Sequence, residues 1–193
     1  MTARRCPCVA TRYASRIWIF GLGCWLIGLG LGLPHGAAAG LFGLIDEAQL
    51  QTNRGSQVDQ FGRAVDVSGD LAVVGAFWDD DVAPDAGAAY VYRRTGSTWV
   101  EEAKLTASDG ANNDRFGRDV AIDGSILLAG CHLHDDGAMN AGAVYVFVRE
   151  STGWRQEAKL IPNDPRFSGA FGFRVAVAGN LALIGVERDS EVA

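Results

Sequence analysis

The sequence predicts an all-β fold built from repeated four-stranded units, and three observations lead to this prediction. The chain repeats itself with a period of 55 residues, because 21 of the 55 positions in residues 61–115 are identical in residues 116–170. Each repeat holds four short apolar segments, which Gly- and Asp-rich turns separate. Beyond residue 39, no segment shows the apolar spacing of an amphipathic helix. Duplication of this kind is typical of proteins that stack one small unit against the next.

The first complete repeat shows how the four strands are expected to run. They are predicted at residues 63–67, 71–76, 87–93 and 99–105. The pair Ser68-Gly69 is typical of a tight turn between two strands, and a continuous apolar run such as 71–76 is typical of a strand buried on both faces. Strict alternation in the last strand predicts one face made of Trp99, Glu101, Ala103 and Leu105.

Four antiparallel strands in roughly 50 residues form the pattern of a β-propeller blade. A single blade cannot bury both of its faces, so its stability comes from stacking on neighbouring blades. Phe61 and Trp99 are therefore expected to pack between blades. Gly62, Gly75 and Gly87 are expected to let neighbouring backbones approach closely.

The repeat boundaries predict an incomplete propeller of about two and a half blades. Residues 40–60 supply the N-terminal strand and loop of a partial repeat, because Glu47–Leu50 echoes the last strand of the later units. Complete repeats follow at 61–115 and 116–170, and a truncated third repeat occupies 171–193. We therefore expect a truncated gene product or fragment, whose open blade edges invite self-association.

The first 39 residues predict an export signal. Four arginines and no acidic residue precede the uncharged apolar run Ile17–Leu33, and Ala37–Ala39 offers the small residues of a cleavage site. We expect cleavage after Ala39 and a secreted or cell-envelope location. A retained membrane anchor is the alternative, for which an apolar run of 17 residues is short.

Cleavage would leave an acidic chain with one thiol and no membrane span. Thirteen Lys and Arg would remain against 23 Asp and Glu, a formal charge of −10, which disfavours nucleic acid as a partner. Cys131 would be the only cysteine, so no internal disulfide is expected. A buried structural thiol is favoured over a nucleophile, because no histidine is indicated as its partner.

Three motifs of the repeat resemble the FG-GAP repeat. Phe61-Gly62 opens the unit, residues 73–76 are Val-Val-Gly-Ala, and residues 86–92 are Ala-Gly-Ala-Ala-Tyr-Val-Tyr. The likeness covers about residues 46–189, and the stretch 102–110 looks like the bacterial branch of the family. FG-GAP repeats build the β-propeller of integrin alpha chains and of many bacterial secreted proteins. The resemblance therefore implies an integrin-alpha-like propeller in a secreted protein.

The chain departs from the calcium-binding members of this family. In those members an Asp-rich loop joins the first two strands of a unit. Here the same place holds only the short turns Ser68-Gly69, Asp123-Gly124 and Gly179-Asn180. Calcium takes roughly 6–8 oxygen ligands, which such a turn cannot gather. The family's ion site does not carry over, so no cofactor is expected, and calcium binding would have to use another loop.

No metal site is predicted, although acidic loops offer candidates. These are Asp79, Asp81 and Asp85 in the first unit and Asp135 and Asp136 in the second. A solvated loop is the favoured alternative. His132 and His134 lie two residues apart, so on a strand they would face the same side and could chelate a transition metal with Asp135 or Asp136. This alternative is disfavoured, because zinc sites need three or four converging ligands. Phe77 and Asp79 occupy those two places in the first unit, so the pair is not a feature of the repeat.

The remaining polar residues point away from catalysis. The loop residues Asp109, Asn112, Asn113 and Asp114 are expected to shape a turn by bonding to nearby backbone. No nucleophile with a partnered base, no paired carboxylates and no phosphate or dinucleotide loop is found, so no enzyme is expected.

The sequence therefore favours a secreted binding or adhesion module, whose loops contact an extracellular protein or glycan. Two alternatives remain open. One is the scaffold part of an extracellular hydrolase, which acidic or His residues recurring around a shared pocket on one rim would favour. The other is a purely structural repeat, either an envelope component or the fragment of a longer protein.

Overall fold

The computed structural model describes residues 17–22, 44–52 and 59–187, and this part of the chain contains twelve β-strands and no helix. The first complete unit holds β3 (Val65–Ser68), β4 (Leu71–Ala76), β5 (Ala88–Thr95) and β6 (Thr98–Leu105). The second unit holds β7 (Phe116–Asp123), β8 (Ile126–Cys131), β9 (Ala143–Glu150) and β10 (Gly153–Leu160). The third unit holds β11 (Phe171–Ala178) and β12 (Leu181–Val186). The prediction of an all-β fold of repeated four-stranded units is confirmed.

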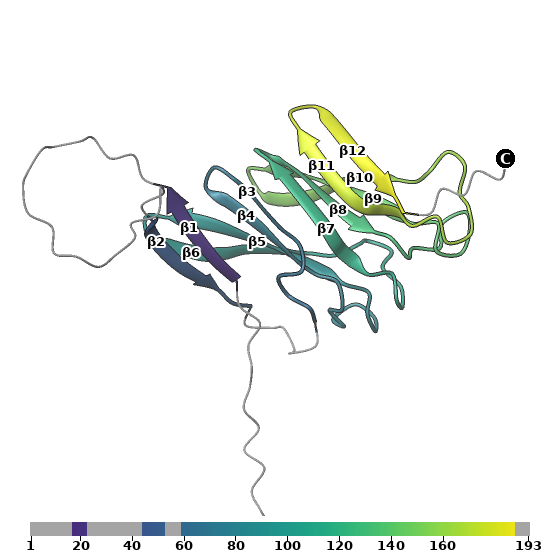
Figure 1. Ribbon diagram of the computed structural model, residues 1–193, viewed down its shortest axis with the longest axis horizontal. Helices are drawn as coiled ribbons and strands as arrows, with labels where there is room; N and C mark the ends of the chain where they lie inside the picture. Colours follow the sequence, from purple (N-terminus) through teal and green to yellow (C-terminus); the bar gives the residue numbers. More distant parts are fainter. Residues whose placement is uncertain (1–16, 23–43, 53–58, 188–193) are drawn as a thin grey trace, which may run out of the picture.

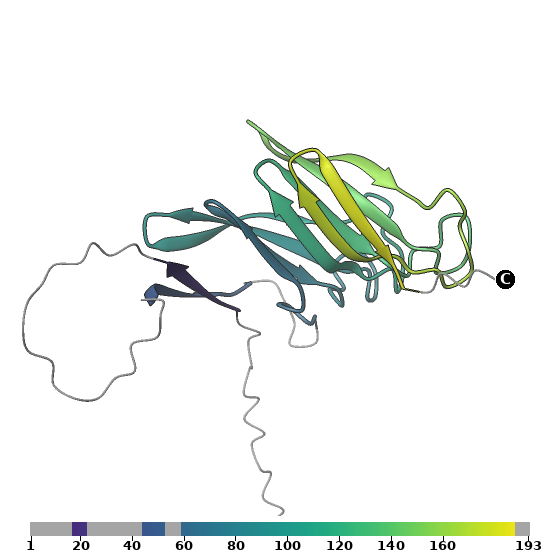
Figure 2. The same cartoon turned by 45° about the horizontal axis from the view of Figure 1, so that its top comes forward.

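Each unit is one antiparallel sheet whose strands follow chain order, from β3 to β6 and from β7 to β10. The sheets lie side by side in the order of the sequence, as blades of an incomplete propeller do (Figures 1 and 2). The first strand of each unit lies next to the preceding unit: β7 contacts β3 and β4, and β11 contacts β7 and β8.

The N-terminal part of the described chain is a two-stranded sheet. Strand β1 (Ile17–Leu22) runs antiparallel to β2 (Leu44–Leu50), and β2 contacts the outer strand β6 of the first unit. β1 lies inside the segment that the sequence assigns to the export signal. The rest of that segment, including the cleavage site at Ala37–Ala39, lies outside the described residues, so the export signal stays a prediction. Within the described part of the chain, no helix is long and apolar enough to cross a membrane.

The apolar core lies between units. Leu50 of β2 is buried with Phe61, Tyr90 and Tyr92 of the first unit, and Trp99 packs against this cluster. The largest cluster joins Val73 and Leu105 of the first unit to Phe116, Tyr145 and Phe147 of the second. A third cluster joins Leu128 and Val144 of the second unit to Val175 of the third. Because each unit buries its faces only against its neighbours, stacking supplies most of the stability, as the repeat predicts.

Glycine lets neighbouring units approach backbone to backbone. A Cβ atom on Gly75 would lie 2.1 Å from the carbonyl oxygen of Gly117, and one on Gly87 would lie 2.1 Å from that of Phe116. The second unit repeats the contact, because a Cβ on Gly130 would lie 2.0 Å from the carbonyl oxygen of Gly172. The prediction that glycines mark close backbone approaches is confirmed at Gly75 and Gly87.

The predicted alternation of the fourth strand is wrong, because a β-bulge interrupts it. Tyr92 of β5 pairs with Glu101, but the preceding Val91 pairs with Ala103, so Glu102 is an extra residue in β6. Beyond the bulge the strand presents its other face. Trp99 therefore packs toward β2, whereas Ala103 and Leu105 pack toward the second unit. β10 has the same irregularity, between Gln156 and Ala158.

The bulge places the Glu102 carboxylate between the first and second units. Its oxygens accept hydrogen bonds from Arg93, from Arg149 at 2.7 Å and from the Trp154 indole at 2.9 Å. Burial alone would raise the pKa of Glu102, but the hydrogen bonds from Arg149, Arg93 and Trp154 outweigh it and lower its pKa to about 2. The ionised Glu102 therefore joins the first unit to the second through ion pairs and a hydrogen bond.

Candidate functional site

The longer loops of the described units lie at one edge of the stacked sheets. Because the strands alternate in direction, the loop after the second strand and the loop that leads to the next unit end up at the same edge (Figure 1). We call this the loop edge, and it consists of residues 77–87, 106–115, 132–142 and 161–170. Among the described residues, the opposite edge carries only tight turns such as Gly69-Asp70, where Gly69 has a φ of 59°. Four of the five buried polar residues of the described chain, Asp79, Asp114, His132 and His134, belong to the loop edge.

Backbone hydrogen bonds hold the loops of one unit against each other. Asn113 N donates to Pro84 O at 2.9 Å, and Phe116 N donates to Ala86 O at 2.8 Å. The second unit repeats both bonds, from Ser168 N to Met139 O at 2.9 Å and from Phe171 N to Ala141 O at 2.8 Å. Asn113 has a left-handed φ of 66°, as expected of a turn residue. The loop edge is therefore a fixed surface, and its repeated geometry carries different side chains in each unit.

Asp79 is the centre of a buried polar network in the first unit. It is 2 % exposed, and Lys104 Nζ donates to both of its carboxylate oxygens at 2.8 Å. The Tyr90 hydroxyl also donates to Asp79 at 2.8 Å, and Lys104 reaches Asp81 at 2.5 Å. Burial alone would lower the pKa of Lys104, but the hydrogen bonds to Asp79 and Asp81 outweigh it and raise its pKa. The network therefore ties the start of the loop 77–87 to strands β5 and β6.

His134 takes the place of Asp79 in the second unit, and Lys159 takes that of Lys104. His134 Nδ1 lies 2.9 Å from an Asp114 carboxylate oxygen, and its Nε2 lies 2.6 Å from Lys159 Nζ. An ammonium group can only donate, so Nε2 accepts this bond and Nδ1 carries the proton that is donated to Asp114. Lys159 is also paired at 2.7 Å with each of Asp109 and Asp136.

Cys131 lies beside this network. Asp114, Cys131 and His134 are buried and offer metal-ligand atoms within 4.8 Å of one another. The Cys131 thiol donates to the backbone oxygen of Asp114 at 3.3 Å, and burial raises its pKa, which suits an inert structural thiol. Both nitrogens of His134 are already bonded, so a metal ion would have to displace Asp114 or Lys159. The geometry favours a structural network, and the expectation of no metal centre stays a prediction.

The acidic residues named from the sequence do not converge on one point. Asp81 and Asp136 each pair with the lysine of their own unit. Asp85, with a φ of 54°, sits in a turn, where its N–H donates to Asp80 at 2.7 Å. Asp135 accepts the equivalent bond from Asn140 N at 2.8 Å. These carboxylates shape and anchor the loops.

The structure separates the two histidines that the sequence pairs. β8 ends at Cys131, so the alternation of a strand does not extend to both histidines. His134 turns toward Tyr145, with ring centroids 6.2 Å apart, whereas the His132 ring lies 5.5 Å from Phe173 of the third unit. His132 lines a small cavity at the junction of the second and third units, together with Arg115 and Asn140.

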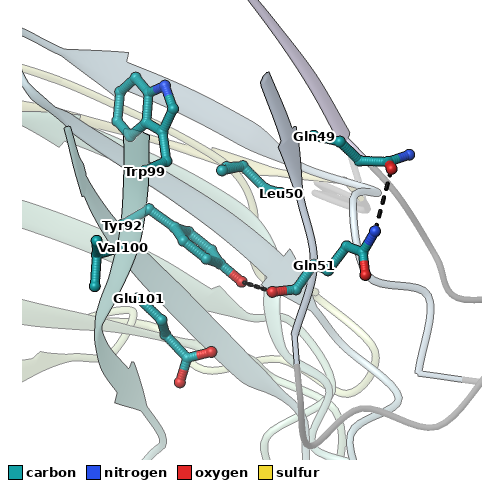
Figure 3. A pocket seen from close by; sticks show the side chains of 7 residues that line it. All are labelled: Gln49, Leu50, Gln51, Tyr92, Trp99, Val100 and Glu101. Carbon is teal, nitrogen blue, oxygen red and sulfur yellow. Dashed lines mark hydrogen bonds between the residues drawn. The ribbon is translucent and has the colours of Figure 1, made fainter. Parts of the chain in front are cut away.

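A second cavity, of about 320 Å³, lies where β2 meets the first unit (Figure 3). Trp99 and Tyr92 face Leu50 across it, and the Tyr92 hydroxyl donates to Gln51 O at 3.2 Å. Burial, followed by the charge of Glu101, raises the pKa of Tyr92. Glu101 is the only charged residue among its described lining, so this cavity shows no convergence of reactive groups.

Large apolar side chains are exposed on the loop edge. Val82 is 48 % exposed, Met139 is 52 % exposed and Phe167 is 68 % exposed. Each stands among polar residues: Val82 follows three aspartates, and Phe167 follows Arg166. Exposed apolar residues rimmed by polar ones are typical of an interaction surface.

Sequence reasoning missed the basic and aromatic partners of these networks. Lys104 and Lys159 recur within the Glu-Ala-Lys-Leu motif, and Tyr90 and Tyr145 recur within the third strand. Their recurrence at the repeat period was a usable signal. The recurrence marks these lysines and tyrosines as identical positions of the repeat, but only the structure shows that they lie beside the side chain at position 79 or 134.

Comparison with known protein families agrees with this architecture. The family model described as FG-GAP repeat matches three times, at residues 45–92, 99–147 and 154–193, which together cover more than two thirds of the chain. The first two matches each begin near the last strand of one unit and run into the third strand of the next, and the third match begins in β10 and includes β11 and β12, so each match spans a stacking junction. No curated protein sequence matches the chain. The chain belongs to the FG-GAP repeat family, and its stacked four-stranded units are the β-propeller blades of that family.

Proposed function

We propose that the chain is an exported, non-catalytic binding module whose loop edge attaches to an extracellular protein or glycan. The observation that carries this proposal is the exposure of Val82, Met139 and Phe167 on loops that backbone hydrogen bonds hold in place. An exposed aromatic side chain on a fixed surface loses little conformational entropy when a partner covers it. FG-GAP repeats are typical of extracellular proteins, which agrees with the predicted export signal.

The bonding of the loop-edge side chains supports a role without catalysis. Asp79 in the first unit and His134 at the equivalent position of the second are both buried, and each is already bonded to the lysine of its own unit. A general base needs a free acceptor within reach of a substrate, and a nucleophile needs a base beside it. Asp79 and His134 meet neither requirement, so they favour a scaffold over the hydrolase alternative.

Binding can be tested with a panel of purified glycans and extracellular matrix proteins immobilised on one surface. We expect saturable binding of the purified chain to at least one of them, and a loss of at least tenfold in affinity for the double variant F167A/M139A. Val100 is 56 % exposed on the outer strand β6, so V100A removes a comparable apolar side chain away from the loop edge and should bind normally. No saturable binding to any member of the panel, or an equal loss for V100A, would contradict the proposal.

A further inference from the structure

A cavity of about 240 Å³ opens at the loop edge between the second and third units. Its lining includes Arg115, His132, Asn140, Ser168, Ala170 and Glu187. Pockets for drug-sized molecules are typically about 300–1,000 Å³, so this cavity suits a smaller group, such as one sugar ring.

Comparison of the repeats explains why the cavity exists at this junction. At the equivalent places of the first junction stand Phe77, which is 7 % exposed, and Arg115. The second junction has His132 in place of Phe77 and Ala170 in place of Arg115, and both are smaller. The left-handed backbone of Arg115 and Asn140 recurs at Gln60 and Asp85, so it belongs to the repeat and not to the cavity.

Two buried side-chain nitrogens of residues that line this cavity lack a partner among the described residues. His132 is 6 % exposed, and its Nδ1 makes no hydrogen bond there. The Nε of Arg115 is also buried and without a hydrogen bond in this part of the chain. Buried polar groups in folded proteins are nearly always paired, because leaving one unpaired costs free energy. Two unpaired nitrogens in the lining residues of one cavity point to a hydrogen-bond partner that a ligand brings.

The charges around the cavity select an anionic acceptor. Arg118 lies over the Phe173 ring at 4.4 Å and over the Phe77 ring at 5.6 Å. Arg174 lies over the same Phe173 ring at 5.4 Å, and burial, then the charges of Arg63 and Arg174, lowers the pKa of Arg118. Burial, then Arg118 and Arg115, lowers the pKa of His132 to about 4. A positive site on an acidic protein attracts an anion, even though Asp119 and Glu187 offset part of its charge.

We propose that this cavity binds the carboxylate-bearing sugar of an acidic glycan. Arg115 holds the carboxylate through charge-assisted hydrogen bonds from its guanidinium, and the neutral His132 ring donates to it in the tautomer that carries its proton on Nδ1. Glu187, Asn140 and Ser168 offer oxygens that accept from ring hydroxyls, which a bare inorganic anion cannot use. This assignment rests on the proposed function, because it names the chemical class of its glycan partner.

The repeat supplies the variants for the test. R115Q introduces the residue found at position 60, and H132F introduces the residue found at position 77, so each places a side chain that the fold already carries at that site of another unit. T95E introduces the residue of position 150 at the exposed end of β5, at the opposite edge, and serves as the matched control. Glucuronate and its oligosaccharides are the probes, with glucose and inorganic phosphate as competing ligands, and calorimetry and the His132 imidazole NMR signals are the readouts.

We expect glucuronate to bind saturably and to shift the His132 signals, with glucose and phosphate at least tenfold weaker. R115Q and H132F should each lose at least tenfold in affinity while unfolding cooperatively, and T95E should bind as the original chain does. If H132F does not fold, R115Q alone decides. Equal binding of glucose or phosphate, or unchanged binding by R115Q, overturns the assignment. If glucuronate fails while Phe167-dependent binding to another partner persists, only the cavity assignment falls. If glucuronate binds but F167A/M139A binds every tested partner as well as the original chain does, the result contradicts the proposed function instead.

Discussion

Adding one methyl group at Gly130 should weaken the junction between the second and third units. Gly130 lies on β8, and its new Cβ would sit 2.0 Å from the Gly172 oxygen and 3.1 Å from the Gly172 carbon. Ordinary contacts of this kind are longer by more than about 1 Å, and the obstacle is backbone, which cannot rotate away as a side chain does. Overpacking typically costs about 1–3 kcal/mol, so we expect G130A to lose about 3 kcal/mol, at the upper end of that range.

Gly185 provides the matched control, because it occupies the same repeat position in the third unit. Among the described residues, its Cβ would meet only Arg174, at 3.2 Å from the Arg174 Cβ, which a small shift relieves. We expect G185A to change the free energy of unfolding by less than about 1 kcal/mol. Urea unfolding measures both variants, and amide exchange of β11 and β12 reports whether the third unit has separated from the second. Values for G130A and G185A within about 0.5 kcal/mol of each other would refute the stacking argument.

Four further outcomes are expected. E102Q should destabilise the chain by about 2 kcal/mol at pH 7, after a discount for its partly exposed arginine partners. Because folding lowers the pKa of Glu102 from 4.5 to about 2, the difference in unfolding free energy between E102Q and the original chain should shrink as the pH falls from 4.5 to about 2. Acid titrations of stability measure this difference, and a constant difference would contradict the prediction. Calcium or a chelator should leave the melting temperature unchanged, whereas a site filled at ten times its Kd would add about 1.4 kcal/mol and a clear rise in Tm. Leu183 is 75 % exposed on β12, so the chain should self-associate there and L183K should reduce this in light scattering, while a monodisperse monomer of the original chain would disprove it. Mass spectrometry of exported material should find Gly40 at its N-terminus, and an intact Met1 in a membrane fraction would argue for a retained anchor.

The strands were predictable because local pattern and repetition agree. The run at 71–76 is apolar at every position, and the structure buries every one of these residues in β4. The predicted turn at Ser68-Gly69 lies one residue later, at Gly69-Asp70, because Ser68 ends β3 and pairs with Leu71, and Gly69 supplies the left-handed residue with a φ of 59°. Each of these features depends on neighbours in sequence, and the duplication shows it again 55 residues later.

The bulge and the polar networks were not predictable, because they depend on contacts between distant residues. Glu102 stands within an otherwise regular strand pattern, and its carboxylate bonds to Arg93 and Arg149, which lie 9 and 47 residues away in the sequence. His134 and Asp114 are 20 residues apart and belong to different loops, so no spacing rule brings them together. The disfavoured alternative of a metal site on His132 and His134 applied strand geometry to residues that follow the end of β8, and the two rings contact different neighbours.

The duplication separates the positions that build the fold from those that distinguish one unit from another. Gly75 and Gly130 are identical and make the same backbone contact with the next unit, so selection for stacking suffices to explain them. Position 79 and position 134 differ, and a second position of the network differs with them. Asp79 accepts from both Lys104 and Tyr90, whereas in the second unit Asp109 accepts from Lys159 and Tyr145. Substituting D79H alone should therefore not reproduce the second network, since the first unit has Arg54 at the place of Asp109. Side-chain differences at the loop edge thus come in interacting sets, and specificity for a partner has to be sought in such sets and not in single residues.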